Sequence, residues 1–550
     1  MARTRTQRLE GQIVDLQARR IYAGAVEWRA GRITRLIEDA SVHARRLILP
    51  GLVDAHIHIE SSLLPPAEFA RLAVSHGTVA TVSDPHEIAN VLGVAGVKYM
   101  IREGRRTPLK FNFGAPSCVP ATNFETAGAA LDAATVAQLL ARRDVKYLAE
   151  VMNFPGVLAR APGLMAMIAA ARKAGKPVDG HAPGLRGAQA RAYAAAGPST
   201  DHECCTLAEA QDKLAAGMRI LIREGSAARN FAALAPLLKT HPGRVMFCCD
   251  DLHPDLLLGG HIDRHVRRAL AAGADKFDVL RCASVNPVEH YRLDVGLLRP
   301  GDPADFIVVD GWEKFRVQQT WLRGELAAAN GRCRLPRQRP ATPNRFRARP
   351  RSAADFAVPA GVGRINFIEA LNGQLITRHR RASALIVDGC AVADAPRDLL
   401  KIAVVNRYAP RAPVALGFIR GFGLQAGAMA SSVAHDSHNI VAVGCDDGSL
   451  AMAVNHVIRH HGGLSVVGPG QSAVLPLPIA GLMSNRDGRT VARHYTQLDR
   501  MAKQLGSQLD APFMTLSFMA LLVIPDLKLS DRGLFSASRW GLVPLQSPRR

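Results

Sequence analysis

The chain of 550 residues lacks any apolar run long enough to cross a membrane. A membrane-spanning helix needs about 20 predominantly apolar residues, whereas the longest candidate, residues 513–525, is shorter and contains Thr515 and Ser517. The basic first residues, Met1 to Arg5, are not followed by the apolar segment of a secretory signal. We therefore expect neither a membrane partner nor secretion.

Cysteine is infrequent, and its pattern excludes two kinds of site. Nine cysteines, an odd number in a long chain, argue against a disulfide framework and indicate a reducing cytoplasm. The adjacent pairs 204–205 and 248–249 lack the spacing of zinc knuckles, so we interpret them as small core residues. No Pro-Cys-x-x-Cys motif occurs, which excludes the zinc deaminases that combine it with His-x-Glu, although His58-Ile59-Glu60 matches the first half.

Acidic residues are few relative to basic ones: 47 aspartates and glutamates stand against 69 lysines and arginines, which gives a formal net charge of +22. A basic balance can indicate a nucleic-acid partner, but here the arginines are spread through Ala- and Leu-rich helical text, as at Arg71, Arg142 and Arg172. The densest run, residues 337–351, is rich in proline and lies between two periodic regions, so it indicates a linker. We expect no specific nucleic-acid partner, and a non-catalytic nucleic-acid-binding protein is the less favoured alternative.

Between residues 52 and 274, short apolar strands alternate with helical stretches such as 133–143, 163–174 and 231–240. This alternation predicts βα units around a parallel sheet. Eight units of this length predict a (β/α)₈ barrel of the α/β class. The expected strands are 52–56, 78–84, 109–114, 145–150, 177–181, 199–202, 219–223 and 244–250.

Regions of different character flank the predicted barrel. Short strands punctuated by turns fill residues 8–37, and a similar turn-plus-strand run at 295–310 can rejoin them. After the linker, strand-like text at 382–387, 402–405 and 465–467 and a helix at 491–505 indicate a separate α+β domain. We therefore expect a composite β-sandwich from residues 1–49 and 295–335, a barrel at 50–294, a linker at 336–354 and a C-terminal domain at 355–550.

The first candidate strand ends in His56-Ile57-His58, directly after the turn signal Pro50-Gly51. On a strand, residues i and i+2 point to the same face, so both imidazoles can reach one metal ion. Taken alone, the pair is equally well explained by one core and one surface histidine. The hypothesis of a metal site therefore depends on further ligands at the other strand ends.

The other predicted strand ends supply these ligands, because barrel enzymes place their chemistry at the carboxyl ends of the strands. Glu150 ends the fourth strand, His181 the fifth, His202 the sixth and Asp250 the eighth. Four histidines and two carboxylates suit two divalent ions with one shared carboxylate, and Zn, Fe(II) or Mn(II) fits this donor set. Asp250 is the natural acceptor for the proton of a metal-activated water.

Long motifs in the chain resemble those of the bacterial-type adenine deaminases, within the amidohydrolase superfamily. The resemblance covers nearly the whole sequence. It lies in residues 49–62 (LPGLVDAHIHIESS), 84–91 (DPHEIANV), 150–153 (EVMN), 179–184 (DGHAPG), 222–227 (IREGSA), 435–440 (HDSHNI), 475–482 (LPLPIAGL), 516–518 (LSF) and 523–525 (VIP).

The resemblance implies hydrolysis of adenine to hypoxanthine and ammonia in purine salvage. It implies two divalent ions per subunit, for which we expect manganese, with iron or zinc as alternatives. The ligands would be His56, His58, His181 and His202, with Glu150 bridging and Asp250 also moving the proton. The expected partner is the small-molecule substrate, in a homo-oligomer of undetermined size.

Other residues near the predicted site have two interpretations each. His86 and Glu87 would contact the base or a metal, or cap the next helix; Arg223 and Glu224 would bind the purine or form an internal ion pair. Asp251 is a substrate-binding candidate, although we favour a cap or loop hydrogen bond for it. For the group of His435, Asp436 and His438, a polar turn outside the barrel is favoured over a lid or an additional metal site.

Some positions depart from the family pattern or leave an alternative open. Leu252 replaces an arginine, and Leu256 a common acidic residue, while Cys205 and Cys249 stand where threonine is frequent. Leu252 leaves open a related amidohydrolase that acts on another amino-purine or a cyclic amide. Lys146 is the alternative metal bridge, since cyclic-amide hydrolases often use a modified lysine on strand four, but it lies well below the strand end.

Overall fold

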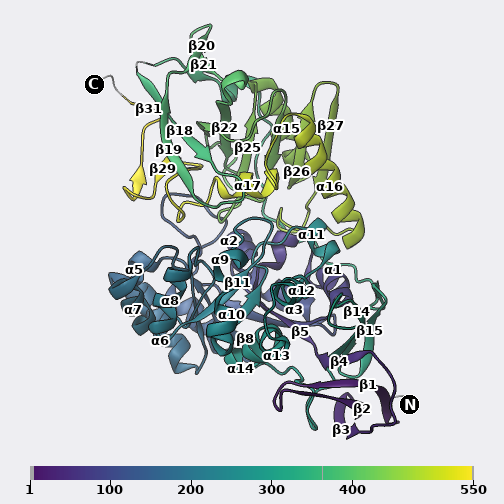
Figure 1. The fold of residues 1–550 in the computed structure, drawn as a ribbon. Coiled ribbons are helices and arrows are strands. Elements are labelled where there is room, and N and C mark those ends of the chain that lie inside the picture. The colour runs from purple at the N-terminus through teal and green to yellow at the C-terminus, as the bar shows by residue number, and fades with distance from the viewer. Residues whose placement is uncertain (1–4, 362, 548–550) are drawn as a thin grey trace.

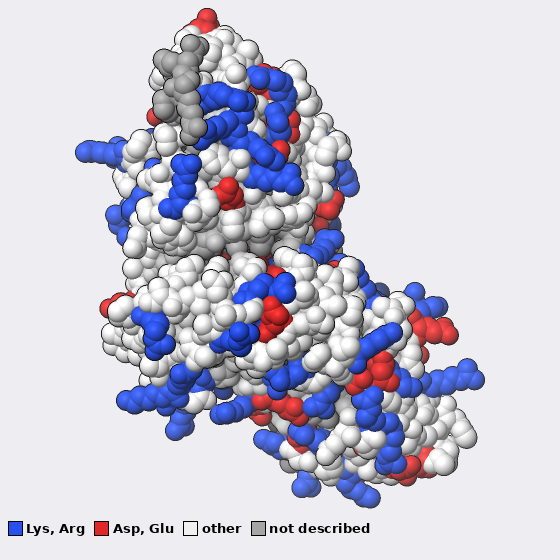
Figure 2. Space-filling view, turned by 60° about the vertical axis from the view of Figure 1, so that its left-hand side comes forward, with Lys and Arg blue, Asp and Glu red and all other residues white. Residues whose placement is uncertain are grey.

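The computed structural model describes residues 5–361 and 363–547 of the chain. Figure 1 shows the barrel in the middle, a β-sheet at the foot of the molecule and a second lobe above the barrel. No helix within these residues has the length and apolar character to span a bilayer. Lysine and arginine side chains are scattered over both lobes on the face in Figure 2, with acidic residues among them.

Two segments far apart in the sequence build the sheet at the foot. Its strand order is β16-β15-β14-β13-β4-β1-β2-β3. The join is the antiparallel pair of β13 and β4, with Phe306 opposite Pro50. Trp28, Phe306 and Trp321 pack edge to face or stacked in its core. The strands are β1 (Gln7–Asp15), β2 (Arg20–Arg29), β3 (Arg32–Glu38), β4 (Leu47–Pro50), β13 (Phe306–Val309), β14 (Val317–Leu322), β15 (Glu325–Ala329) and β16 (Arg332–Cys333).

Eight parallel strands form the predicted barrel. They make two arcs, β5 to β9 and β10 to β12. The Ser199 N–H bonds to the Val178 carbonyl at 2.8 Å between the arcs, and the Asp250 N–H bonds to the His56 carbonyl at 2.9 Å to close the ring. All eight predicted strands are confirmed: β5 (Leu52–Ile57), β6 (Thr78–Ser83), β7 (Lys110–Ala115), β8 (Val145–Val151), β9 (Val178–Gly180), β10 (Thr200–Asp201), β11 (Arg219–Arg223) and β12 (Val245–Cys248).

The barrel helices follow the predicted pattern with one exception. The stretch 231–240 is two short helices, because Pro236 between them supplies no backbone N–H. The helices are α1 (Pro66–Ala73), α2 (His86–Leu92), α3 (Val94–Gly104), α4 (Ala133–Leu140), α5 (Phe154–Leu158), α6 (Pro162–Lys173), α7 (Gly187–Ala196), α8 (Leu207–Ala215), α9 (Phe231–Leu234), α10 (Leu237–Thr240), α11 (Pro254–Gly259), α12 (Ile262–Ala271), α13 (Lys276–Leu280) and α14 (Asn286–Tyr291).

The upper lobe is built on a nine-stranded sheet with the order β19-β18-β23-β22-β25-β24-β26-β27, to which β31 (Gln546–Ser547) adds beside β18. Its strands are β18 (Arg364–Ala370), β19 (Thr377–Ala382), β22 (Leu400–Val405), β23 (Val414–Arg420), β24 (Ala428–Ser431), β25 (Ile440–Gly444), β26 (Gly463–Gly468) and β27 (Gln471–Pro476). The helices are α15 (Asp447–Arg459), α16 (Gly488–Gln504) and α17 (Pro512–Phe518).

Two three-stranded sheets complete this lobe, and one predicted strand is wrong there. The stretch 382–387 is not continuous, because β19 ends at Ala382 and the following strand pairs in a different sheet. The small sheets contain β17 (Val358–Pro359), β20 (Leu385–Val387) and β21 (Cys390–Val392), and β28 (Leu527–Ser530), β29 (Gly533–Ser536) and β30 (Gly541–Leu542).

Residues 336–352 contain no helix or strand and run between the lobes. The segment is nevertheless bonded to both. Arg345 donates to the Gly128 carbonyl of the barrel, and the Arg347 N–H bonds to the Arg407 carbonyl of the upper lobe at 2.7 Å. These contacts hold the segment against the surface.

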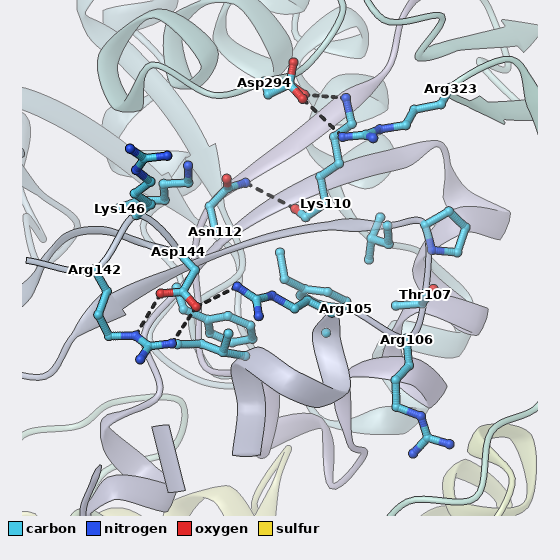
Figure 3. Close-up of a pocket in the computed structure, with 17 residues that line it drawn as sticks. Arg105, Arg106, Thr107, Lys110, Asn112, Arg142, Asp144, Lys146, Asp294 and Arg323 are labelled. Carbon is cyan, nitrogen blue, oxygen red and sulfur yellow. Dashed lines mark hydrogen bonds and ion pairs between the residues drawn. The ribbon is translucent and has the colours of Figure 1, made fainter. Parts of the chain in front are cut away.

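Two cavities lie at opposite ends of the barrel. A small one, of about 30 Å³, lies at the carboxyl ends of the strands, under the upper lobe. A large one, of about 1070 Å³, lies at the amino ends of β7 and β8 and is shown in Figure 3. Lys146 lines the large cavity, so it is at the wrong end of its strand to bridge metals beside Glu150.

Candidate active site

The structure brings all six predicted metal ligands together at the carboxyl ends of the barrel strands. None of these side chains is more than a tenth exposed. His56 lies on β5 and Glu150 on β8. His58, His181 and His202 directly follow β5, β9 and β10, and Asp250 lies two residues beyond the end of β12. Barrel closure therefore collects residues that are almost 200 positions apart in the sequence.

Glu150 lies between two pairs of histidines. Its Oε1 is 3.2 Å from His58 Nε2 and 3.8 Å from His56 Nε2. Its Oε2 is 2.6 Å from His181 Nδ1 and 3.3 Å from His202 Nε2. One carboxylate thus presents a separate oxygen to each pair, which is the arrangement that a bridge between two metal ions requires.

Asp250 completes the group on the side of β5. Its Oδ1 lies 3.1 Å from His58 Nε2 and 3.5 Å from His56 Nε2, and its Oδ2 lies 4.0 Å from His202 Nε2. The backbone at Asp250 has φ 56°, a left-handed conformation that is rare for residues other than glycine. Two backbone hydrogen bonds hold that conformation: the Asp250 N–H donates to the His56 carbonyl, and the His58 N–H donates to the Asp250 carbonyl.

The chemistry of the donor set fits divalent metal ions. His56 Nε2 and His58 Nε2 face each other at 3.2 Å, with carboxylate oxygens of Glu150 and Asp250 on the same side. Since the Asp84 carbonyl accepts a hydrogen bond at His58 Nδ1, 3.2 Å away, the proton resides there and the lone pair of Nε2 is directed at the carboxylates. Groups at this site whose ligand atoms lie within 4.8 Å of one another include His56, His58 and Asp250; His56, Glu150 and His202; His181, His202 and Glu203; and His58, Asp84, His86 and Glu150.

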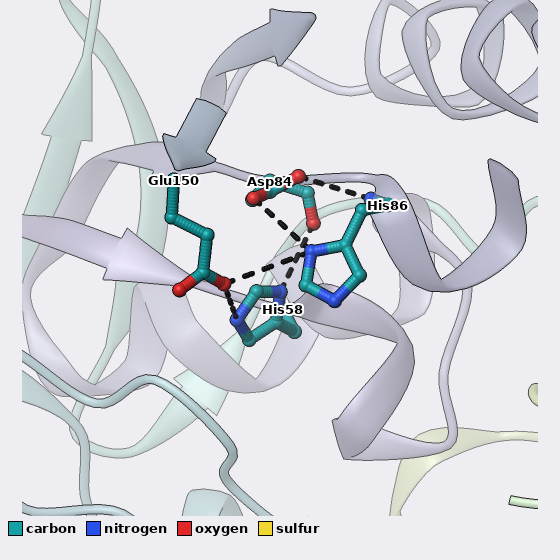
Figure 4. Close-up of side chains that lie close together, drawn as sticks. All are labelled: His58, Asp84, His86 and Glu150. Atoms are coloured by element: carbon teal, nitrogen blue, oxygen red, sulfur yellow. Dashed lines mark hydrogen bonds and ion pairs between the residues drawn. The ribbon is translucent and has the colours of Figure 1, made fainter. Parts of the chain in front are cut away.

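His86 lies beside this centre rather than only capping α2. Figure 4 shows its ring next to Asp84, His58 and Glu150. His86 Nδ1 is 3.1 Å from Asp84 Oδ2 and 3.7 Å from Glu150 Oε1. Asp84, which sequence reasoning quoted within a motif but assigned no role, accepts the His86 N–H at 3.0 Å and so fixes the start of α2.

Arg223 does not line the cavity, and the ion-pair interpretation is the one that the structure supports. Its guanidinium donates to Asp250 Oδ2 at 2.5 Å and also to Glu203. Burial opposes ionisation of Asp250, but the Arg223 charge and the facing histidines hold its pKa well below the usual range. Glu203, which lines the cavity, was missed in the sequence although it follows His202.

For Glu224, too, the structure shows the ion-pair alternative and not a contact with the cavity, because its side chain points away from the site. Glu224 Oε2 accepts from Arg268 at 2.6 Å and Oε1 from the Phe231 N–H at 3.2 Å. The residue after β11 turns toward the outer helices, whereas Arg223 before it turns inward. Alternation along a strand places neighbouring side chains on opposite faces, which accounts for the difference.

The 435–438 loop of the upper lobe, for which a polar turn of the C-terminal domain was the favoured interpretation, reaches into the site and contacts the barrel. Glu87 of α2 accepts hydrogen bonds from His435 Nδ1, at 2.5 Å, and from His438 Nε2. Because His438 Nδ1 accepts the Ala434 N–H at 3.2 Å, the proton of this imidazole must reside on Nε2. Both Glu87 oxygens are therefore engaged by the upper lobe.

The small cavity is walled on one side by metal-ligand candidates and on the other by the upper lobe. Leu375, His435, Asp436, Phe518 and Leu521 form the second wall. The His435 ring stacks on Phe518, with centroids 5.0 Å apart and planes at 26°. Asp251 also lines the cavity and accepts a hydrogen bond from Ser61.

The surroundings of His435 favour its protonated form. Burial lowers the pKa of its imidazole, but the carboxylates of Glu87 and Asp251 outweigh burial and raise the pKa to about 9. Within the described residues, His435 Nε2 is buried and has no hydrogen-bond partner. It lies 3.9 Å from Asp251 Oδ1, beyond hydrogen-bonding range. A buried N–H without an acceptor therefore faces the cavity.

Comparisons with known proteins agree with this geometry. Residues 47–327 match the model of the amidohydrolase family, and residues 374–540 match the model of the adenine deaminase C-terminal domain. The chain is 58% identical to the adenine deaminase of Salinibacter ruber, over 97% of this chain and 98% of that protein. It is 54% identical to the adenine deaminase of Sulfurovum sp. (96% and 97%) and 50% identical to that of Methanosarcina acetivorans (97% and 98%).

Proposed function

Because this chain belongs to the amidohydrolase family, and within it is similar over nearly its whole length to adenine deaminases, we propose that it hydrolyses adenine to hypoxanthine and ammonia. The observation that carries the proposal is the near-complete coverage at 58% identity. That similarity includes the C-terminal domain, whose His435 loop walls the cavity. Loss of the exocyclic amine with gain of the water oxygen balances the reaction.

The proposed metal ligands are His56, His58, Glu150, His181, His202 and Asp250. Two divalent ions bound there would lower the pKa of water and polarise the ring carbon C6 of the purine. Manganese is the proposed metal, with iron or zinc as alternatives, since a mixed imidazole and carboxylate set accommodates all three. Glu150, with one oxygen toward each histidine pair, is the proposed bridge.

Asp250 is the proposed proton carrier. It would take the proton of the attacking water at one oxygen and deliver it to the departing amine. Arg223 and the left-handed backbone hold its carboxylate toward the histidines. Glu203, which shares the Arg223 guanidinium and lines the cavity, is proposed to keep that guanidinium in place.

His435 is proposed to bind the purine from the upper lobe. Its Nδ1 is held by Glu87, so its Nε2–H is available to a ring nitrogen of the base. Phe518, which stacks on His435, supplies an apolar face for a flat ring. Asp251 and His86 are proposed to contact the substrate from the barrel side.

Several finer features are proposed with the activity. The product would enter purine salvage. The nine free cysteines favour the cytoplasm. We propose a homo-oligomer without a nucleic-acid or membrane partner. The division into a composite β-domain (1–49 and 295–335), barrel (50–294), linker (336–354) and C-terminal domain (355–550) is also proposed.

The decisive experiment is an assay of metal-supplemented protein with adenine, guanine and dihydroorotate. Ammonia release and the ultraviolet spectrum are followed for the purines, and ring opening for dihydroorotate. The proposal expects turnover of adenine far above that of the other two. Preferred turnover of guanine or dihydroorotate would instead support the alternative of a related amidohydrolase with another substrate.

A further inference from the structure

The large cavity at the amino ends of the barrel strands is strongly basic. Seven lysine and arginine residues and two aspartates line it, as the labelled side chains in Figure 3 largely show. The cations come from separate elements: β7 and β8, the segments that follow α3 and α4, and the turn between β14 and β15. They are Arg105, Arg106, Lys110, Arg142, Arg143, Lys146 and Arg323.

The acidic residues of the cavity neutralise only part of this charge. Asp144 accepts from Arg105 at 2.7 Å and from Arg142 at 2.7 and 2.8 Å. Asp294 pairs with Arg323 at 3.1 Å. Two further cations form ion pairs with carboxylates that do not line the cavity: Lys110 with the buried Asp305, and Arg106 with Glu103.

The side chains of Arg143 and Lys146 have no ion-pair or hydrogen-bond partner within residues 5–361 and 363–547. Lys146 is half-buried on β8, and Arg143 lies in the exposed segment after α4. Cations at a helix end can simply complement the helix dipole, which would account for Arg143 but not for Lys146 on a strand. Burial and, after it, the charge of Lys146 lower the pKa of Lys176, while Asp144 opposes them.

The remaining walls offer apolar and hydrogen-bonding surface. Ile101, Leu109 and the half-buried ring of Phe111 lie beside the cations. The buried Thr107 hydroxyl lacks a hydrogen-bond partner in the described part of the chain. A volume of about 1070 Å³ is at the upper end of small-molecule sites, which run from about 300 to 1,000 Å³.

We propose that this cavity binds a nucleoside 5′-phosphate, with the phosphates at Arg143 and Lys146 and the base against the apolar wall near Phe111. Arginine and lysine are the usual phosphate-binding side chains, and an anion here would receive charge that no carboxylate of the cavity has neutralised. The site is separate from the metal ligands, at the other end of the strands. This proposal does not depend on the deaminase activity, and the two can be tested separately.

The test is calorimetric titration of the metal-loaded full chain with ATP, AMP, adenosine and pyrophosphate at low and physiological salt. The structure predicts saturable binding of ATP and AMP, about tenfold weaker binding of pyrophosphate and none of adenosine at this cavity. Binding of ATP weakens as salt rises, because Arg143 is exposed and Lys146 is only half-buried, so that salt screens both charges. Pyrophosphate binding as tight as that of ATP would overturn the nucleotide assignment.

The matched variants carry equal charge changes at different places. Arg143→Glu/Lys146→Glu is expected to lose at least about tenfold in ATP affinity, whereas Arg45→Glu/Arg411→Glu is expected to keep the wild-type value. Arg45 and Arg411 are exposed and, in the described chain, without ion-pair partners. Equal loss in both variants would show non-specific attraction by net charge and overturn the site, as would unchanged binding in the cavity variant.

A milder variant and an independent readout guard against misfolding. Arg143→Gln/Lys146→Gln removes the charges without reversing them and is expected to weaken ATP binding by a smaller factor. Both cavity variants are expected to keep wild-type metal content and adenine turnover, because Lys146 and Glu150 face opposite ends of β8. Tight binding of single-stranded DNA that displaces ATP would overturn the small-molecule proposal.

Discussion

Arg223 and Asp250 form a buried ion pair behind the proposed metal centre, with Arg223 Nη1 2.5 Å from Asp250 Oδ2. The other oxygen of the same carboxylate faces His56 and His58. Asp250 is thereby held between a fixed cation and the histidines, on a residue with a left-handed backbone. Its orientation is set by the fold, which suits a group that must transfer a proton at a defined point.

The substitution Asp250→Asn is expected to preserve the fold and abolish nearly all turnover. Asparagine matches aspartate in size but cannot carry the transferred proton, and general acid–base groups typically contribute about 10²- to 10⁴-fold in rate. The measurement is the loss of adenine absorbance, with the melting temperature and metal content as controls. Turnover close to wild type in a metal-loaded variant would contradict the role of Asp250.

Arg223→Gln is expected to destabilise the protein by about 3–5 kcal/mol, because it leaves the buried carboxylates of Glu203 and Asp250 without their cation. Arg268→Gln is the control, since Arg268 pairs with Glu224 at the surface and such pairs contribute about 0–1 kcal/mol. Urea unfolding of both variants gives the comparison. If both variants lost a similarly small free energy of unfolding, the ion pairs of Arg223 would not be an essential buried contact.

Metal analysis tests the bridging role of Glu150. Wild-type protein supplemented with manganese is expected to hold about two ions per chain, and Glu150→Ala fewer than one, because its two oxygens serve both histidine pairs. Removal of the metals with a chelator is expected to lower the melting temperature, since ligands of the folded state stabilise it. Two ions in Glu150→Ala would refute the bridge.

The barrel and the meeting of the six candidate ligands could be predicted from the sequence because both depend on local patterns. Apolar strands and helical stretches alternate regularly, and the strand-end rule selects the six candidates without knowledge of the long-range contacts. They are His56, His58, Glu150, His181, His202 and Asp250. At Glu224 the rule could not choose between purine binding and an ion pair, because it gives the strand end but not the face on which the side chain lies.

The contribution of the upper lobe could not be predicted in the same way. His435 and Glu87 are 348 positions apart, and no periodicity in either segment encodes their meeting. Docking of the lobes brings them together, and it also places Phe518 and Leu521 over the cavity. The available signals were two histidines and an aspartate within the four residues of the 435–438 loop, and the family resemblance of residues 435–440 and 516–518.

The proposed contact of His435 with the purine can be tested with 1-, 3- and 7-deazaadenine, each of which replaces one ring nitrogen by C–H. Inhibition of adenine turnover should show that one analogue binds wild type about tenfold more weakly than the others, as expected for a lost buried hydrogen bond. In metal-loaded His435→Phe, which retains a ring to stack on Phe518, that difference should vanish. The same difference in both proteins would rule out His435 as the donor.

The pH dependence of stability tests the charge of His435. Glu87 and Asp251 raise its folded pKa to about 9, although burial opposes them, so its stabilising effect is complete below the ordinary value of about 6.5 and disappears as pH rises to about 9. Asp436, His438 and His253 also interact electrostatically with this imidazole.

The melting temperature of wild type should exceed that of His435→Gln most near pH 6.5 and least above pH 9. His438→Gln is the control: burial lowers the pKa of His438, so its imidazole is neutral throughout this range and its difference from wild type should stay constant. A constant difference for His435→Gln as well would mean that the His435 imidazole is neutral over this pH range and donates to the Glu87 carboxylate as a neutral group.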